Sequence, residues 1–235
     1  MPSLGTQLGV WAHPDDETYL AAALMAQGVR DGSRVVCVTA TKGEGGSWDE
    51  ERWPSETMGE VRAEELLRGM ELLGVNDHRW LGYIDAACAD VPPEEGAAKV
   101  QAIIEEVQPD SVLTFGPDGM TDHADHKAVS AWTTEAFGRS AKPGATLYYA
   151  TTTPEWAAEF VPRMNKFNVF APGLPPVTPR EELAIGFELP PDLLDLKLKA
   201  IACHVSQVEY MMKYFGEDFF REAHGLEAFR LAAVK

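Results

Sequence analysis

The architecture of this chain follows from residues 7–17, QLGVWAHPDDE, where a short apolar segment leads directly into a cluster of charge. Gln7–Ala12 is predicted to be a buried strand, and Glu17–Arg30 a helix with an apolar inner side. The β-branched run in Arg34–Thr41 is typical of a strand that is buried on both faces in a parallel sheet. Strand, helix and strand in this order indicate a right-handed βαβ unit. The charged turn then lies at the carboxyl end of the first strand, where open α/β sheets bind their ligands.

The alternation of strands and helices continues along the chain. Further helices are expected at residues 55–73, 94–107, 124–137 and 190–207, and further strands at residues 80–83, 111–115, 147–151 and 183–189. The pattern predicts a three-layer α/β fold with a mostly parallel sheet. Residues 1–235 are interpreted as a single domain. Periodicity fails at about 152–180, which is rich in proline, so this segment is expected to be a lid over the substrate or a subunit contact.

Composition and charge restrict the classes of partner. The chain has 235 residues, of which 45% are hydrophobic and 24% are charged, and its formal net charge is −17. So acidic a chain, without a cluster of Lys or Arg, repels a nucleic-acid backbone. No stretch approaches the roughly 18 apolar residues that span a bilayer, and the N-terminus lacks the pattern of a secretory signal. We therefore expect a cytoplasmic protein that acts on a small molecule, with no nucleic-acid or membrane partner.

Two clusters of imidazoles and carboxylates have the composition of a metal site. In the first, His13 and Asp16 are three residues apart and suit a divalent ion of the zinc type. The second, His123-Ala124-Asp125-His126, has two imidazoles that share a face at the mouth of a predicted helix. Two histidines and one aspartate with an open position are typical of a catalytic zinc site rather than a structural one. Each cluster alone has an ordinary interpretation, as a capping residue or as helix polarity, and their coincidence is what favours Zn²⁺.

Three motifs taken together resemble a known family. They are Ala12-His13-Pro14-Asp15-Asp16-Glu17, then His123-x-Asp125-His126, and finally Lys197-x-x-Ala200-x-x-x-His204-x-Ser206-Gln207. In this order they resemble the PIG-L/LmbE-like zinc-dependent de-N-acetylases, which include N-acetylglucosaminyl deacetylases of the mycothiol and bacillithiol pathways. The resemblance extends over most of the chain and implies a Rossmann-like arrangement of the three layers. Homo-oligomers are frequent in the family, which leaves a homo-oligomer open here.

The clusters and the resemblance agree on the chemistry. Zn²⁺ held by His13, Asp16 and His126 lowers the pKa of a bound water towards about 7. Asp15 cannot easily bind the same ion as its neighbour, yet it remains close enough to act as general base. A cationic His123 is expected to stabilise the oxyanion together with zinc, and either His123 or Asp15 to protonate the leaving amine. The mechanism of the family matches these roles residue by residue.

Two further residues are candidates for contact with the substrate. Arg62 has acidic neighbours on the helix at 55–73, which is typical of an ion-pairing solvated face, whereas the resemblance places it near the substrate. Asp85 is either a turn residue or, by resemblance, an acceptor for a sugar hydroxyl. The glycine-rich loop at residues 42–54 lacks a phosphate-binding pattern, and its resemblance to a family loop predicts a place at the rim of the site.

This chain departs from the family pattern at two positions. Ala124 stands where the family usually has proline, which changes only backbone stiffness. Thr121 stands where some members have tyrosine, which puts the rate and the substrate in doubt. His204 shares a helix face with Lys197 and is expected near the pocket, with no role assigned. The two histidines outside these motifs are expected to be structural.

The leading hypothesis is a zinc-dependent hydrolase that removes an acetyl group from an N-acetylated amino sugar conjugate. An amidase that cleaves a thiol conjugate by the same zinc chemistry is the nearest alternative. A metal-dependent phosphoesterase is a second, since clustered aspartates also hold Mg²⁺, but two imidazoles with a single carboxylate favour zinc. A sugar-binding module without turnover is the third, although every expected catalytic position is filled.

Overall fold

The computed structural model describes residues 4–233 and contains one seven-stranded sheet with the strand order β3-β2-β1-β4-β5-β7-β6. The strands are β1 (Gln7–Trp11), β2 (Val35–Thr39), β3 (Asp77–Trp80), β4 (Ser111–Thr114), β5 (Thr146–Ala150), β6 (Ile185–Glu188) and β7 (Leu226–Leu231). Strands β1 to β5 pair in parallel, and β7 is antiparallel to both β5 and β6. The mostly parallel sheet predicted from the sequence is therefore confirmed.

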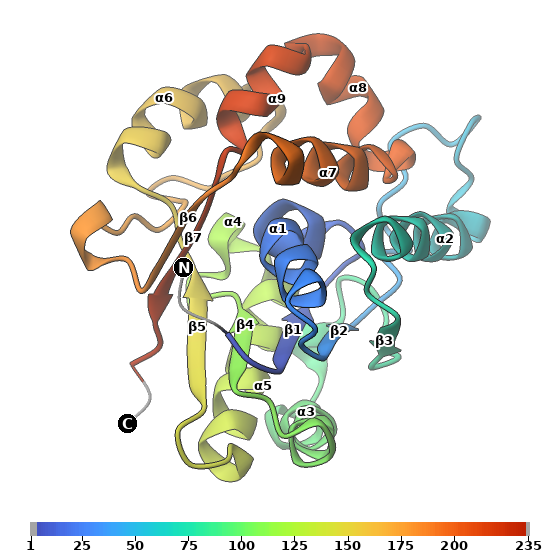
Figure 1. Cartoon of the computed structure of the whole chain (residues 1–235). Coiled ribbons are helices and arrows are strands. Elements are labelled where there is room, and N and C mark those ends of the chain that lie inside the picture. The colour runs from blue at the N-terminus through green and yellow to red at the C-terminus, as the bar shows by residue number, and fades with distance from the viewer. Residues whose placement is uncertain (1–3, 234–235) are drawn as a thin grey trace.

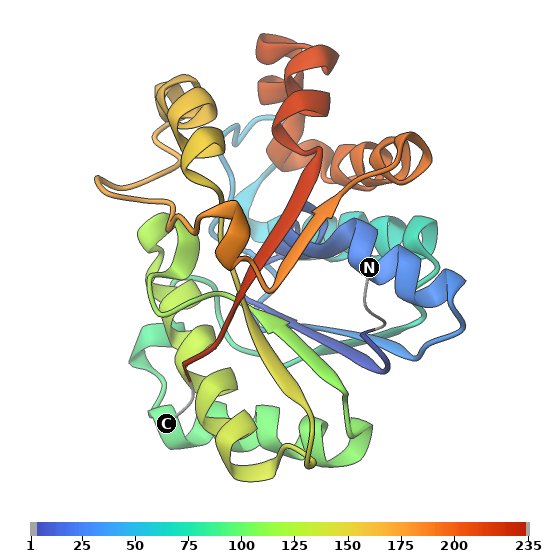
Figure 2. The ribbon, with the colours of Figure 1, turned by 60° about the vertical axis from the view of Figure 1, so that its left-hand side comes forward.

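Helices cover both faces of the sheet and complete the three layers (Figure 1). They are α1 (Asp16–Arg30), α2 (Ser55–Leu73), α3 (Pro93–Val107), α4 (Gly119–Asp122), α5 (Ala124–Ser140), α6 (Pro154–Met164), α7 (Pro191–Ala202), α8 (Val205–Phe215) and α9 (Glu217–Ala223). In Figure 1, α1, α2 and α7 pack together above the sheet, and α3 packs against α5 below it. Helices α6, α8 and α9 lie at the top of the view, beyond the sheet. In Figure 2, β7 descends from the end of α9 and lies between β5 and β6.

The centre of the sheet places the two charged clusters beside each other. Every residue of β1 and β2 is buried, because both strands are covered by helices on their two faces. The strand order reverses between β1 and β4, since β2 and β3 lie on one side of β1 and β4 and β5 on the other. Ligands of open α/β sheets bind at such a switch point, outside the carboxyl ends of the strands. The clusters that follow β1 and β4 therefore meet there.

The proline-rich segment contains a helix that the sequence analysis missed. Helix α6 begins at Pro154, and the Thr153 hydroxyl caps it by accepting a hydrogen bond from Trp156 N at 3.2 Å. Proline is favourable in the first turn of a helix, where its missing N–H leaves no carbonyl unpaired. The interpretation of residues 152–180 as wholly irregular was thus wrong for Pro154–Met164. The predicted role as a lid or subunit contact stays a prediction.

Two other boundaries differ from those expected. The third strand is Asp77–Trp80 rather than residues 80–83, because Gly82 adopts a left-handed φ of 75° that takes the chain out of the sheet. The helix expected at residues 190–207 ends at Ala202, and a new helix begins at Val205. Within residues 4–233, no helix is both long enough and apolar enough to cross a bilayer.

Candidate metal centre

Three side chains predicted to bind metal converge at the switch point. His13 follows β1, Asp16 begins α1, and His126 lies in the first turn of α5. His13 Nδ1 lies 3.1 Å from His126 Nε2 and 3.8 Å from Asp16 Oδ2, and His126 Nε2 lies 3.5 Å from Asp16 Oδ1. Zinc bonds to nitrogen of about 2.0–2.1 Å in tetrahedral geometry put neighbouring ligand atoms roughly 3.3–3.4 Å apart. The two ring nitrogens are spaced as ligands of such an ion, whereas Asp16 turns a different oxygen towards each ring. The groups of three residues whose ligand atoms lie within 4.8 Å of one another are His13, His123 and His126, and His13, Asp85 and Asp125.

The outer nitrogens of the two rings are held by the protein. His126 Nδ1 is 2.9 Å from the carbonyl oxygen of Gly119. His13 Nε2 is 3.0 Å from Asp85 Oδ1 and 3.2 Å from Asp125 Oδ2. A ring that donates its outer N–H to these oxygens, as metal-bound histidines do, turns a lone pair inwards. A proton on His13 Nδ1 bridges this 3.1 Å contact by donating to His126 Nε2, and a metal cation bound between the two nitrogens would take the place of that proton.

The charges and the burial around His13 and His126 favour a positive charge between these two rings. Burial, together with the neighbouring His13, lowers the pKa of His126 to about 4, so this imidazole is neutral at pH 7 as a ligand must be. Burial also acts to lower the pKa of His13, but hydrogen bonds to Asp125 and Asp85 outweigh it and raise this pKa to about 10. The two carboxylates thus stabilise a charge on His13, whether a proton or a metal ion supplies it.

Asp125 is a functional candidate that the sequence analysis did not assign. Its carboxylate accepts hydrogen bonds from Ala86 N at 2.7 Å and Cys88 N at 3.1 Å besides contacting His13. It therefore fixes the loop after β3 and the His13 ring together. The sequence did point to Asp125, because it lies between the two histidines of the second cluster. Its role could not be predicted, because the residues that it contacts are far away in the sequence.

Both carboxylate oxygens of Asp85 already have partners in the protein. One carboxylate oxygen contacts His13 Nε2, and the other accepts a hydrogen bond from Gly45 N at 2.9 Å. These contacts give Asp85 a positioning role for His13 and for the glycine-rich loop. The predicted contact of Asp85 with a sugar hydroxyl stays a prediction.

Replacing Asp85 with asparagine tests whether this carboxylate acts through His13. The amide keeps the shape but removes the charge that stabilises a cation on the ring, so we expect zinc affinity to fall by about 10–100-fold. Competition with a chelator measures this affinity, and Asp90→Asn, an exposed aspartate five residues away, is the matched control. An increase in KM with unchanged zinc affinity would instead support the contact with substrate.

Asp15 lies next to the metal ligands in a strained backbone conformation. Its φ is 108°, which a non-glycine residue rarely adopts and which functional sites often contain. Burial raises the pKa of Asp15 to about 6 despite the positive charge of Arg62. A carboxylate with a pKa this close to neutrality is suited to both accepting and donating a proton.

Arg62 holds Asp15 and the glycine-rich loop in place. Its guanidinium donates to Asp15 Oδ2 at 3.2 Å, to Pro14 O at 2.6 Å and to Gly43 O at 3.0 Å. A Cβ atom at Gly43 would lie 2.2 Å from Arg62 Nη1, so this close approach requires glycine. Arg62 is buried and lines the cavity, but its contact with substrate stays a prediction.

His123 caps α5 beside the other two imidazoles. The ring nitrogens of His13, His123 and His126 lie within 4.8 Å of one another. His123 Nδ1 accepts a hydrogen bond from Asp125 N at 3.2 Å, which leaves Nε2 to carry the proton of the neutral ring. Burial, then the charge of His13 and His126, lowers the pKa of His123. The lowered pKa thus favours a neutral ring over the cationic form expected from the sequence, and the role of His123 as a donor stays a prediction.

The residues of the C-terminal motif, Lys197 to Gln207, make contacts that hold helices together. Lys197 Nζ lies 2.8 Å from Glu227 Oε1, and this carboxylate also accepts two backbone N–H groups of α1. His204 Nε2 lies 3.2 Å from Glu17 Oε1, and both side chains are buried. Neither Lys197 nor His204 is among the described residues that line the cavity, and His204 lies behind the lining, in contact with Glu17 beside Asp16. The motif links α7, α8 and β7 to α1, behind the metal centre.

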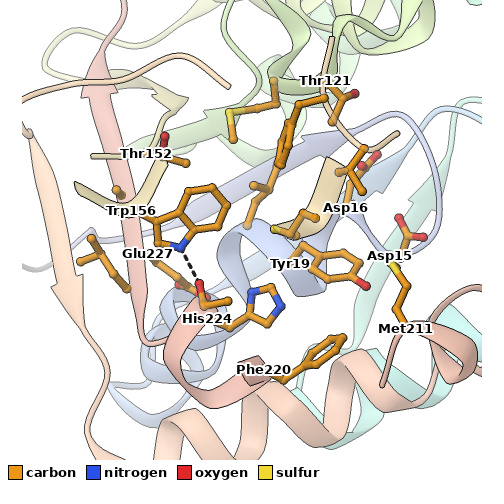
Figure 3. A pocket seen from close by; sticks show the side chains of 18 of the residues that line it. Asp15, Asp16, Tyr19, Thr121, Thr152, Trp156, Met211, Phe220, His224 and Glu227 are labelled. Atoms are coloured by element: carbon orange, nitrogen blue, oxygen red, sulfur yellow. Dashed lines mark hydrogen bonds between the residues drawn. The ribbon is translucent and has the colours of Figure 1, made fainter. Parts of the chain in front are cut away.

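A cavity of about 360 Å³ opens on the metal centre. His13, Asp15, Asp16 and His126 line one part of it, and Arg62 lies beside them. Figure 3 shows Asp15 and Asp16 on one side of the cavity and Thr152 and Trp156 on the other. The residues predicted to bind metal and the predicted base therefore face a space that a small molecule can enter.

Comparisons with known proteins agree with this site. The family model PIG-L, described as GlcNAc-PI de-N-acetylase, matches residues 8–137, which include both histidine clusters. A 1D-myo-inositol 2-acetamido-2-deoxy-alpha-D-glucopyranoside deacetylase of Thermobifida fusca is 30% identical over 269 residues, covering 94% of this chain and 91% of that protein. The protein of the same name from Kineococcus radiotolerans is 36% identical over 166 residues. That match covers 59% of this chain and 46% of the relative, so it spans about half the relative's length.

A solved structure shares the fold over nearly the whole chain. It is the N,N'-diacetylchitobiose deacetylase from Pyrococcus horikoshii, with a TM-score of 0.63 and 23% sequence identity. The superposition covers 97% of this chain and 83% of the other. The matched family segment and the relative that aligns along most of the sequence together show that this protein belongs to the PIG-L family.

Proposed function

We propose that this protein is a zinc-dependent hydrolase that removes an acyl group, in the simplest case acetyl, from an N-acylated amino sugar. The observation that carries the proposal is the convergence of His13, Asp16 and His126 with Asp15 directly beside them. The names of the relatives, which are deacetylases of a glucosaminyl inositol, support the same reaction class.

The proposed ligands are His13 Nδ1, His126 Nε2 and a carboxylate oxygen of Asp16. Two imidazoles and one carboxylate suit zinc better than magnesium, which prefers oxygen ligands. When bound, zinc supplies Lewis-acid chemistry that makes water nucleophilic at neutral pH and polarises an amide carbonyl. Asp16 Oδ2 also accepts a hydrogen bond from His13 N at 2.8 Å, which fixes the first two ligands relative to each other.

Asp15 is the proposed proton carrier. Its carboxylate takes a proton from the attacking water as the new C–O bond forms at the amide carbon. It then delivers that proton to the nitrogen as the C–N bond breaks, giving a carboxylic acid and a primary amine. The acid then loses its proton, which the amine takes up as an ammonium ion at pH 7. The guanidinium of Arg62 keeps the carboxylate in position during both transfers.

His123 is the proposed donor to the carbonyl oxygen. The neutral ring presents Nε2–H, because Nδ1 is occupied by the backbone N–H of Asp125. A donor aimed at the oxygen that gains negative charge stabilises the transition state more than the ground state.

A panel of substrates tests the proposal. We expect primary amine to be released from at least one compound among N-acetylglucosamine, its inositol glycoside and N,N'-diacetylchitobiose. The activity should disappear after chelation and return with added zinc. Turnover of an acylated cysteinyl conjugate alone would favour the thiol-conjugate amidase, and hydrolysis of a phosphate ester alone would favour the phosphoesterase. Sugar binding without any turnover by the zinc-loaded protein would favour the binding module.

A further inference from the structure

The cavity extends from the metal centre into a region with mainly apolar walls. In Figure 3, Asp15 and Asp16 lie at one side of the cavity, and the indole ring of Trp156 lies at the other. Between them the walls come from α1, α6, the segment after α6, α8 and α9, and include Tyr19, Leu20, Phe170, Met211, Phe215 and Phe220. A volume of about 360 Å³ is within the range of small-molecule sites.

Polar groups in this part of the wall are already bonded to the protein. Trp156 Nε1 donates to the carbonyl oxygen of Ala223 at 2.7 Å. The Thr152 hydroxyl donates to the carbonyl oxygen of Pro176 at 2.9 Å. The carboxylate of Glu227 is occupied by the buried lysine and the α1 backbone described above. These groups line the cavity without being free to bind a ligand.

Two buried polar atoms are left in this part of the wall. The Tyr19 hydroxyl and His224 Nε2 are buried and have no hydrogen-bond partner among residues 4–233. Their rings lie beside each other, with centroids 5.3 Å apart (Figure 3). Burial, assisted by the charge of Lys197, lowers the pKa of His224 to about 3, so its ring is neutral at pH 7. This mainly apolar region thus offers a ligand few hydrogen bonds.

A polyol is poorly matched to such a wall. An inositol or a second pyranose carries several hydroxyl groups, and each one that leaves water needs a new partner. In a region with so few unbonded polar atoms, most of these hydroxyls would stay unpaired. An alkyl chain or an aromatic ring has no such requirement and gains from leaving water.

We propose that the substrate carries an apolar group, an alkyl chain or an aromatic ring, which occupies the cavity between α1, α6, α8 and α9. The group is attached on the acyl side or on the sugar side of the amide that is cleaved. The inference rests on the proposed hydrolase function and names the substrate class of the same site. The cavity is continuous with the metal centre, so one molecule reaches both.

Two series of substrates separate the two points of attachment. One consists of glucosamines with N-acetyl, N-butanoyl, N-hexanoyl and N-octanoyl groups, and the other of N-acetylglucosaminides with methyl, butyl, hexyl and octyl aglycones. We expect kcat/KM to rise by up to about fourfold per added methylene in one series until the cavity is filled. The series that rises identifies the side of attachment. A flat or falling profile in both series would overturn the proposal.

A charge placed in the wall should remove the preference. Val169 lines the cavity, whereas Val177 is half exposed in the same segment and serves as the matched control. We expect Val169→Asp to reduce the ratio of kcat/KM for the longest to the shortest substrate at least tenfold, and Val169→Ile to preserve it. Val177→Asp should leave the ratio unchanged. Equal ratios for both aspartate variants, at wild-type melting temperature, would contradict the proposal.

Binding provides a readout that does not depend on hydrolysis. Octyl glucoside has no amide, so calorimetry with the metal-free protein measures the apolar contact alone. We expect octyl glucoside to bind at least tenfold more tightly than methyl glucoside, and Val169→Asp to abolish the difference. Such binding without cleavage of any amide would leave the apolar site standing and refute the hydrolase. Cleavage with equal binding of the two glucosides would refute the apolar site and leave the hydrolase standing.

Discussion

Replacing Asp15 with asparagine reduces kcat for amide hydrolysis by about 10²–10⁴-fold, the contribution typical of a positioned general base. Asparagine keeps the size of the side chain and can still contact Arg62, but it cannot accept a proton from water. The raised pKa of Asp15, about 6, leaves the wild-type carboxylate ionised at pH 7 and close enough to neutrality to return the proton to the amine. The loss therefore falls on kcat rather than on binding.

The control experiments separate this loss from a loss of metal. Zinc content measured on the purified variant should remain one ion per chain, because Asp15 is not a proposed ligand. Asp31→Asn changes an exposed aspartate at the opposite end of α1 and should keep wild-type kcat. Full activity of Asp15→Asn would exclude Asp15 as the base.

Removing His126 should also abolish most hydrolysis, in this case through loss of zinc. His126→Ala deletes one of three proposed side-chain ligands, so we expect zinc affinity to fall by more than the roughly 10–100-fold that an outer partner contributes. Hydrolysis should then fall to background at zinc concentrations that saturate the wild type. Zinc stoichiometry and the visible spectrum of the cobalt-substituted protein report the coordination directly.

Variants of two other histidines test whether His126, and not another imidazole, binds zinc. His78→Ala removes an imidazole of β3 that contacts Thr39 at 3.0 Å, outside the metal centre, and should not change zinc binding. His123→Ala should retain zinc but lose activity, since His123 is the proposed donor. If His123→Ala lost zinc and His126→Ala retained it, the roles of the two histidines would be exchanged.

The order of elements could be predicted because it is encoded locally. The buried run of β1 and the apolar side of α1 follow from periodicity over a few residues. The two histidine clusters lie just after β1 and β4, and the rule for open parallel sheets brings them together. The resemblance to the PIG-L family rests on the same short motifs, and the family match confirms it.

The contacts that prepare the site depend on the folded chain. His13 is held by Asp125, 112 residues further along the sequence, and Asp15 is held by Arg62, 47 residues further along. No local pattern specifies which distant carboxylate or guanidinium will approach, because that depends on how the elements pack. Helix α6 was not predicted for a related reason. Pro154 stands at its first position, where proline is favourable, but Pro162 lies inside the helix, where the sequence alone predicts a break.

The motifs therefore predict the kind of metal and the kind of reaction, because ligand chemistry depends on which side chains are present. The shape and polarity of the cavity arise from α1, α6, α8 and α9, whose side chains are far apart in the sequence and meet only when the helices pack. A residue such as Phe220 is apolar in any context, but only packing decides whether it faces the core or a ligand. The reaction class can accordingly be predicted from the sequence, whereas the apolar substrate group that we propose can be inferred only from the folded structure.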